Sequence, residues 1–80
     1  MDDAKVLSRI NDLAREEHEL YKRESRGTVS DADRQRLRQI GITLDQCWDL
    51  LRQRRALRAA GRDPEDAHVR DEKTVEGYTS

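Results

Sequence analysis

The residues best suited to binding chemistry in this 80-residue sequence are arginines in its second half. Between Leu50 and Arg62 there is no acidic residue, and the interval holds an Arg cluster made of Arg52, Arg54, Arg55, Arg58 and Arg62. Guanidinium groups form paired hydrogen bonds to phosphates and carboxylates, so this Arg cluster could bind RNA, a nucleotide or an acidic protein surface. The plainer interpretation is ion pairing inside the protein, with Glu16, Glu19, Glu24, Glu72 or Glu76.

Other candidate chemistry is sparse. Glu65 and His68 form a Glu-x-x-His pair, but a di-iron carboxylate bundle needs two such pairs and further glutamates. Cys47 has no CxxC partner and falls among apolar residues at helical spacing, where a free thiol behaves as a small hydrophobe. No aromatic residue interleaves with the Arg cluster, so a stacking platform for single strands is not supported. We therefore expect no catalytic residue, no metal site and no cofactor.

The composition indicates helices with narrow apolar seams. Hydrophobic residues make up 34% of the chain and charged residues 41%, and 16 basic residues nearly balance 17 acidic ones. That balance argues against wholesale nucleic-acid binding. One cysteine cannot form an internal disulfide, no apolar run approaches the roughly 20 residues of a membrane span, and the first residues lack a signal-peptide pattern. We expect a cytoplasmic protein without membrane contact.

Two long helices must position these residues. The first is expected at about residues 3–26, with a heptad seam at Val6, Ile10, Leu13, Glu17, Leu20 and Glu24. The second is expected at about residues 31–60, with its seam at Leu37, Ile40, Leu44, Cys47 and Leu51. Gly27 and Gly61 suit helix C-termini, and Ser30 with Asp33 resembles a capping box.

The two seams match in one antiparallel register. Leu20 then faces Leu37, Leu13 faces Leu44, Ile10 faces Cys47 and Val6 faces Leu51. The fold class predicted is all-α, a coiled-coil-like two-helix hairpin over residues 1–62. In this register position 54 lies opposite position 3, so the longer second helix overhangs the first from Arg55 onward.

Three apolar residues, Trp48, Leu50 and Leu57, fall off this seam, and a two-helix hairpin alone is not expected to bury them. Exposed apolar stripes mark interfaces, so we expect two hairpins to pair as a homodimeric four-helix bundle. Residues 63–80 are expected to form a short turn starting at Asp63-Pro64, followed by an extended or disordered tail.

Two resemblances bear on function. The stretch 44–57 superficially resembles the arginine-bearing first helix of all-helical chorismate mutases, but here it lies in the second helix. The block LDQCWDLLRQRRALRAAGRDP at 44–64 and the VEGY at 75–78 are similar to a small actinobacterial family of uncharacterised proteins, domain of unknown function 2630. This second resemblance implies an actinobacterial cytosolic protein and brings no activity or site residues.

The leading hypothesis is a non-enzymatic interaction or scaffold module that binds itself or another macromolecule. The alternative is binding of RNA or nucleoprotein through the Arg cluster, and an enzyme of chorismate mutase type is third. The residues expected at the interaction surface are Trp48, Leu50, Arg52, Arg54, Arg55, Leu57, Arg58 and Arg62.

Overall fold

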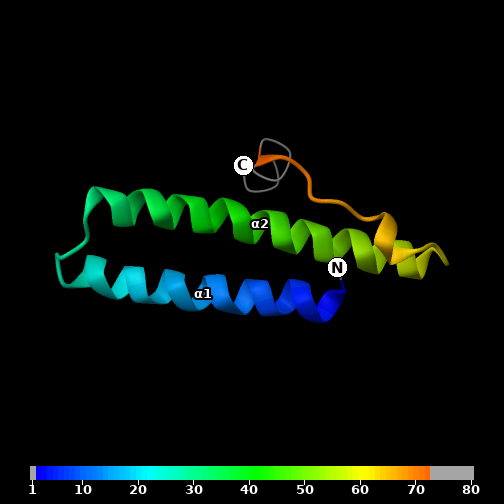
Figure 1. Ribbon diagram of the computed structural model, residues 1–80, viewed down its shortest axis with the longest axis horizontal. Helices are drawn as coiled ribbons and strands as arrows, with labels where there is room; N and C mark the ends of the chain where they lie inside the picture. Colours follow the sequence, from blue (N-terminus) through cyan, green and yellow to red (C-terminus); the bar gives the residue numbers. More distant parts are fainter. Residues whose placement is uncertain (1, 73–80) are drawn as a thin grey trace.

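The computed structural model describes residues 2–72, and within that range the chain is helical and contains no strand. Helix α1 spans Asp3–Ser25, helix α2 spans Asp31–Ala59, and a short 3-10 helix, η1, spans Pro64–Asp66. The two long helices pack against each other as an antiparallel hairpin, and α2 continues past the beginning of α1 (Figure 1). The predicted all-α hairpin with a longer second helix is confirmed.

Local chain signals set the helix ends. Asp2 caps α1 by accepting a hydrogen bond from the Lys5 amide at 2.9 Å. Ser30 and Asp33 form the predicted capping box at the start of α2, each side chain accepting from the backbone amide of the other residue. Gly27 and Gly61 follow the two helices with φ near 72°, the left-handed conformation that a helix C-terminus favours and that glycine adopts without strain.

The hairpin encloses two neighbouring apolar clusters. One contains Leu13, Leu20 and Ile40, and the other contains Val6, Ile10, Leu50 and Leu51. Leu44 and Cys47 pack against both clusters, so the core is continuous along the seam. These contacts follow the predicted antiparallel register. Such a narrow core is what a chain with 34% hydrophobic residues can build.

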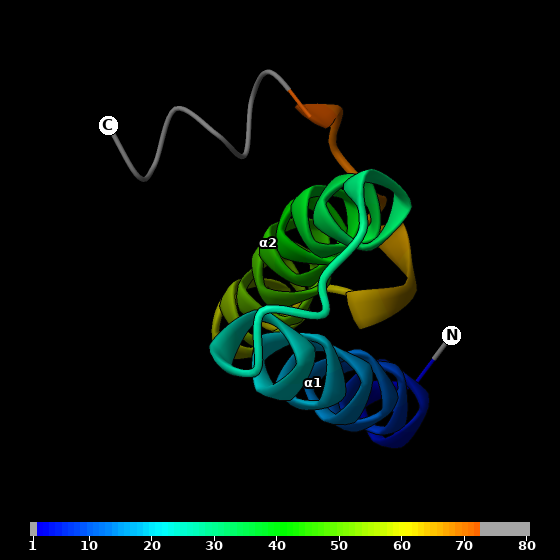
Figure 2. The same ribbon diagram turned by 90° about the vertical axis from the view of Figure 1, so that its left-hand side faces the viewer.

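The expectation that Leu50 stays unburied is wrong, because its side chain is only 8% exposed. After η1 the chain turns back and runs along α2 (Figure 1). Figure 2 shows η1 at one side of the hairpin. Ala67 on this return segment (residues 67–72) packs against the cluster that contains Leu50. The predicted turn at Asp63-Pro64 is present, with Asp63 accepting from the Glu65 amide at 2.9 Å. Residues 73–80 of the predicted tail lie outside the described residues.

Candidate functional site

The Arg cluster is divided by the tertiary structure, and Arg54 lies inside the fold. Its side chain is 7% exposed, and its Nε donates to Asp3 Oδ1 at 2.6 Å. Its Nη1 donates to Glu65 Oε1 at 3.0 Å and to the Pro64 carbonyl at 3.4 Å. Arg54 thus ties the start of α1, the second half of α2 and η1 together. The acidic partners proposed from the sequence were different ones, although the seam register already placed position 54 opposite position 3.

Asp3 also accepts a hydrogen bond from Arg58, one helical turn after Arg54. The hydrogen bonds from Arg58 and Arg54 lower the pKa of Asp3 to about 2. Arg54 likewise lowers the pKa of Glu65 below its usual range. Two arginines of the cluster are therefore neutralised locally, and their guanidinium groups are less available to an outside anion.

The remaining members of the Arg cluster lie at the surface. Arg52, Arg55 and Arg62 are exposed. Among residues 2–72, Arg55 and Arg62 form no ion pair, whereas Arg52 has an interaction partner. The outward charge of this segment thus lies on Arg52 and Arg55, which share one face of α2, and on Arg62 in the following turn.

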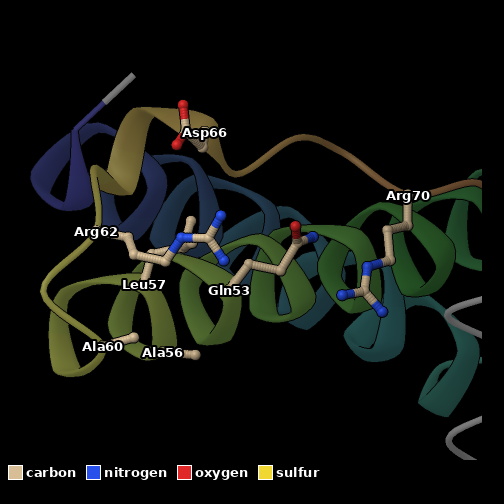
Figure 3. Close-up of a pocket in the computed structure, with 7 residues that line it drawn as sticks. All are labelled: Gln53, Ala56, Leu57, Ala60, Arg62, Asp66 and Arg70. Atoms are coloured by element: carbon tan, nitrogen blue, oxygen red, sulfur yellow. The ribbon is translucent and has the colours of Figure 1, made fainter.

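A shallow groove of about 350 Å³ lies on the part of α2 that overhangs α1. Its floor contains Ala56, Leu57 and Ala60, and Leu57 is half-buried here. Figure 3 shows Arg62 lying over Leu57 with its guanidinium toward Gln53, while Arg70 stands at the other end. Asp66 also lines the groove, so its lining carries charges of both signs and has no single preference for an anion.

A polar ladder on α2, formed by Gln46, Asp49 and Gln53, holds the return segment. Gln53 binds both backbone groups of His68: its Nε2 donates to the carbonyl at 2.8 Å, and its Oε1 accepts from the amide at 3.4 Å. Gln46 donates to the Arg70 carbonyl at 3.2 Å, and the Arg70 side chain pairs with Asp49 at 3.5 Å. Sequence reasoning missed this ladder. The available signal was the spacing of these polar residues: Asp49 and Gln53 follow Gln46 by three and seven positions, which places all three on one face of the helix.

The two flanks of the hairpin differ in what covers them. On the closed flank, Arg36 pairs with Glu16 through two hydrogen bonds of 2.6 and 2.9 Å, and the return segment packs beside Leu50. These hydrogen bonds lower the pKa of Glu16. Figure 2, which looks along the hairpin, shows η1 and the start of the return segment on this flank, whereas Glu72 at its end lines a groove with Tyr21 and Gly41.

The open flank is the opposite one, and it carries Leu7, Ala14, Tyr21, Gly41 and Trp48. Each of these residues directly follows a seam residue, and in an antiparallel helix pair such positions of both helices share a flank. Tyr21 and Gly41 line one groove accordingly. The side chains of Leu7, Tyr21 and Trp48 are 38%, 52% and 42% exposed. The predicted outward position of Trp48 is therefore observed.

Cys47 lies in the core of the hairpin, and His68 lies on the return segment. Cys47 lies half-buried between the two apolar clusters, and burial raises the pKa of its thiol. In the described residues, no group of three or more His, Cys, Asp or Glu side chains is placed to hold a metal ion. No helix among residues 2–72 combines the length and apolar character needed to cross a membrane.

Comparison with known proteins places the chain among uncharacterised relatives. An uncharacterized protein of Mycobacterium bovis is 53% identical over 78 residues, which cover 96% of this chain and 90% of that protein. An uncharacterized protein of Mycobacterium tuberculosis matches to the same extent. No solved structure matches. The family model described as protein of unknown function (DUF2630) matches residues 2–80, and the chain belongs to that family.

Proposed function

We propose that this protein is a non-enzymatic helical interaction module that associates with a second copy of itself through the open flank. The observation that carries this proposal is the exposure of Leu7, Tyr21 and Trp48 along one flank of a highly charged hairpin. Apolar side chains grouped on one surface of a small globular domain are typical of an interface. The opposite flank is already covered by the return segment.

The Arg cluster gives less support to the alternative of nucleic-acid binding. Arg54 and Arg58 both donate to Asp3, which offsets their charge. The groove beside Arg62 contains Asp66 as well. A phosphate backbone is bound by many basic side chains at once, and the pairing with Asp3 reduces the number that this segment offers.

Sedimentation equilibrium, combined with acrylamide quenching of the sole tryptophan, Trp48, tests the proposal. We expect the mass of two chains at high concentration, and quenching that weakens as the dimer forms. Leu7→Ser should shift the equilibrium toward the monomer. Val69→Ser is the matched control, because Val69 is 60% exposed but lies on the return segment, across the hairpin. A monomer at every concentration, with Trp48 equally quenched throughout, would contradict the proposal.

Ionic strength separates this proposal from RNA binding. Apolar association depends little on salt, whereas affinity for RNA falls steeply as salt rises, because binding to phosphates releases counterions. A dimer that persists at high salt, with no RNA retained in a gel shift, is the expected result. Steeply salt-dependent RNA binding, abolished by Arg55→Gln together with Arg62→Gln, would favour the alternative instead.

A further inference from the structure

Helix α1 carries a second seam that does not face α2. Of its 23 residues, 11 are charged, yet a line at spacings of three and four residues avoids all of them. This uncharged seam consists of Ala4, Leu7, Asn11, Ala14, His18, Tyr21 and Ser25. Every one of these side chains is exposed. In a chain with 41% charged residues, an exposed heptad line free of charge indicates a surface that packs against another helix.

The uncharged seam is symmetric about Ala14 to within one position. Ala14 is the central residue of α1, which spans Asp3–Ser25, so two antiparallel copies centred there overlap over the whole helix. Large residues then meet large ones, because Leu7 lies opposite the second copy's Tyr21. In this register Asn11 lies opposite the second copy's Glu17, so Asn11 and the second copy's His18 are one position out of alignment and come close to each other without facing directly.

The choice of a second copy as the occupant rests on this symmetry and on charge. A two-fold interface requires a surface that complements itself, and the pattern on α1 does so. The neighbouring strip of α2 does not, because it carries Arg38, Asp45, Arg52 and Arg55 at equivalent positions. Placing that strip over the uncharged seam would remove charged side chains from water opposite a surface that offers no charge of opposite sign, which is costly. Of these two surfaces, the uncharged seam of a second copy is therefore the better partner for the uncharged seam.

We propose that two copies of this chain pack α1 against α1 in antiparallel orientation through the uncharged seam, with the two-fold axis at Ala14. The small side chain at the centre lets the two helices approach closely. At the ends of a contact about 34 Å long, the tyrosines and leucines supply the apolar area. Trp48 lies on the same flank and lines the edge of the interface. This inference rests on the proposed self-association and specifies its geometry.

Disulfide trapping tests the geometry directly. In a Cys47→Ser background, Ala14→Cys should form an intermolecular disulfide on mild oxidation, because a residue on the axis meets its own copy at close range. Glu19→Cys, exposed on another face of α1, should not. A mixture of Leu7→Cys and Tyr21→Cys proteins should give mainly the mixed dimer, since antiparallel packing brings these two positions together.

A charge placed at Ala14, the centre of the proposed interface, tests the geometry by oligomeric state and without cysteine chemistry. Ala14→Glu should produce a monomer with unchanged helical circular dichroism, whereas Ser8→Glu, off the seam, should leave the dimer intact. If the wild-type protein is dimeric but Ala14→Cys fails to cross-link, or if Leu7→Cys links to itself, the antiparallel geometry is wrong while self-association stands. If the wild-type protein is monomeric, both proposals are overturned.

Discussion

Arg54 on α2 donates to Asp3 on α1 across 51 positions of sequence, at 2.6 Å between Nε and Oδ1. The arginine is buried, and it also contacts the carbonyl of Pro64 and the carboxylate of Glu65. One side chain therefore joins all three helical elements at the end of the hairpin opposite the connecting turn. An arginine suits this position because its planar group offers several donors in fixed directions.

Replacing Arg54 should destabilise the fold more than replacing its exposed neighbour. Arg54→Met keeps the apolar stem but leaves the Pro64 carbonyl and the Asp3 and Glu65 carboxylates with fewer donors. We expect a clear fall in the urea midpoint for this variant. Arg55→Met, which alters an arginine without an ion pair among residues 2–72, should leave the midpoint nearly unchanged. Equal midpoints for the two variants would show that the buried contacts contribute nothing.

Stability should fall as pH drops from about 4 toward 2. Hydrogen bonds from Arg58 and Arg54 lower the pKa of Asp3 from 3.8 to about 2, so the folded state holds this carboxylate ionised where the unfolded state begins to bind a proton. The contribution is complete above the unfolded value and disappears as pH passes through the folded one. Urea midpoints measured across this range should show a weaker slope for Asp3→Asn than for the wild type. Asp12→Asn, exposed on the same helix, should retain the wild-type slope.

Removing the amide of Gln53 should release the return segment. Gln53→Ala deletes both hydrogen bonds to the His68 backbone, each worth about 0.5–1.5 kcal/mol. Hydrogen exchange at the His68 amide should accelerate, and circular dichroism of the long helices should change little. Gln35→Ala, at an exposed position of α2, is the matched control and should leave that amide unaffected. Unchanged exchange in Gln53→Ala would mean that other contacts hold the segment.

Replacing a buried and an exposed leucine by alanine should give very different losses of stability. Leu50→Ala removes a side chain buried between α1 and the return segment and should cost about 2–5 kcal/mol. Leu7→Ala alters an exposed side chain and should change the stability of the monomer by no more than about 0.5 kcal/mol. Chemical denaturation at low protein concentration measures both. A small loss for Leu50→Ala would restore the sequence-based view that Leu50 faces outward.

Two glycines should respond in opposite directions to alanine. Gly41 lies within α2, and a Cβ there would meet no atom within 4 Å beyond the adjacent residues and the nearby backbone of its own helix, so Gly41→Ala should stabilise the fold by up to about 1 kcal/mol. Gly27 has φ near 72°, where a Cβ is strained, so Gly27→Ala should destabilise it by about 1–2 kcal/mol. Thermal unfolding of the two variants provides the comparison. Destabilisation by Gly41→Ala would reveal a close contact on the open flank, as between two copies.

The sequence by itself determined the features that depend on local or periodic signals. Ser30 with Asp33 and the glycines after each helix set the helix ends, because capping acts within a few residues. The matching seams of Val6 to Leu20 and Leu37 to Leu51 determined the antiparallel hairpin, because one register buries both apolar lines at once. The outward position of Trp48 followed from the same register.

Only the tertiary structure decided that Leu50 and Arg54 are buried. Both depend on the chain turning back after Pro64, which covers Leu50 with Ala67 and brings Glu65 to Arg54. The short segment has no helical periodicity that would predict where it docks, and several of its hydrogen bonds to α2 use backbone groups that any residue carries. The polar ladder ending at Gln53 recognises such groups in His68 and Arg70. Leu50 and Arg54, which the sequence placed on an interaction surface, are therefore buried in the fold. They are covered because hydrogen bonds to backbone groups and the ion pair between Arg54 and Asp3 hold distant segments together.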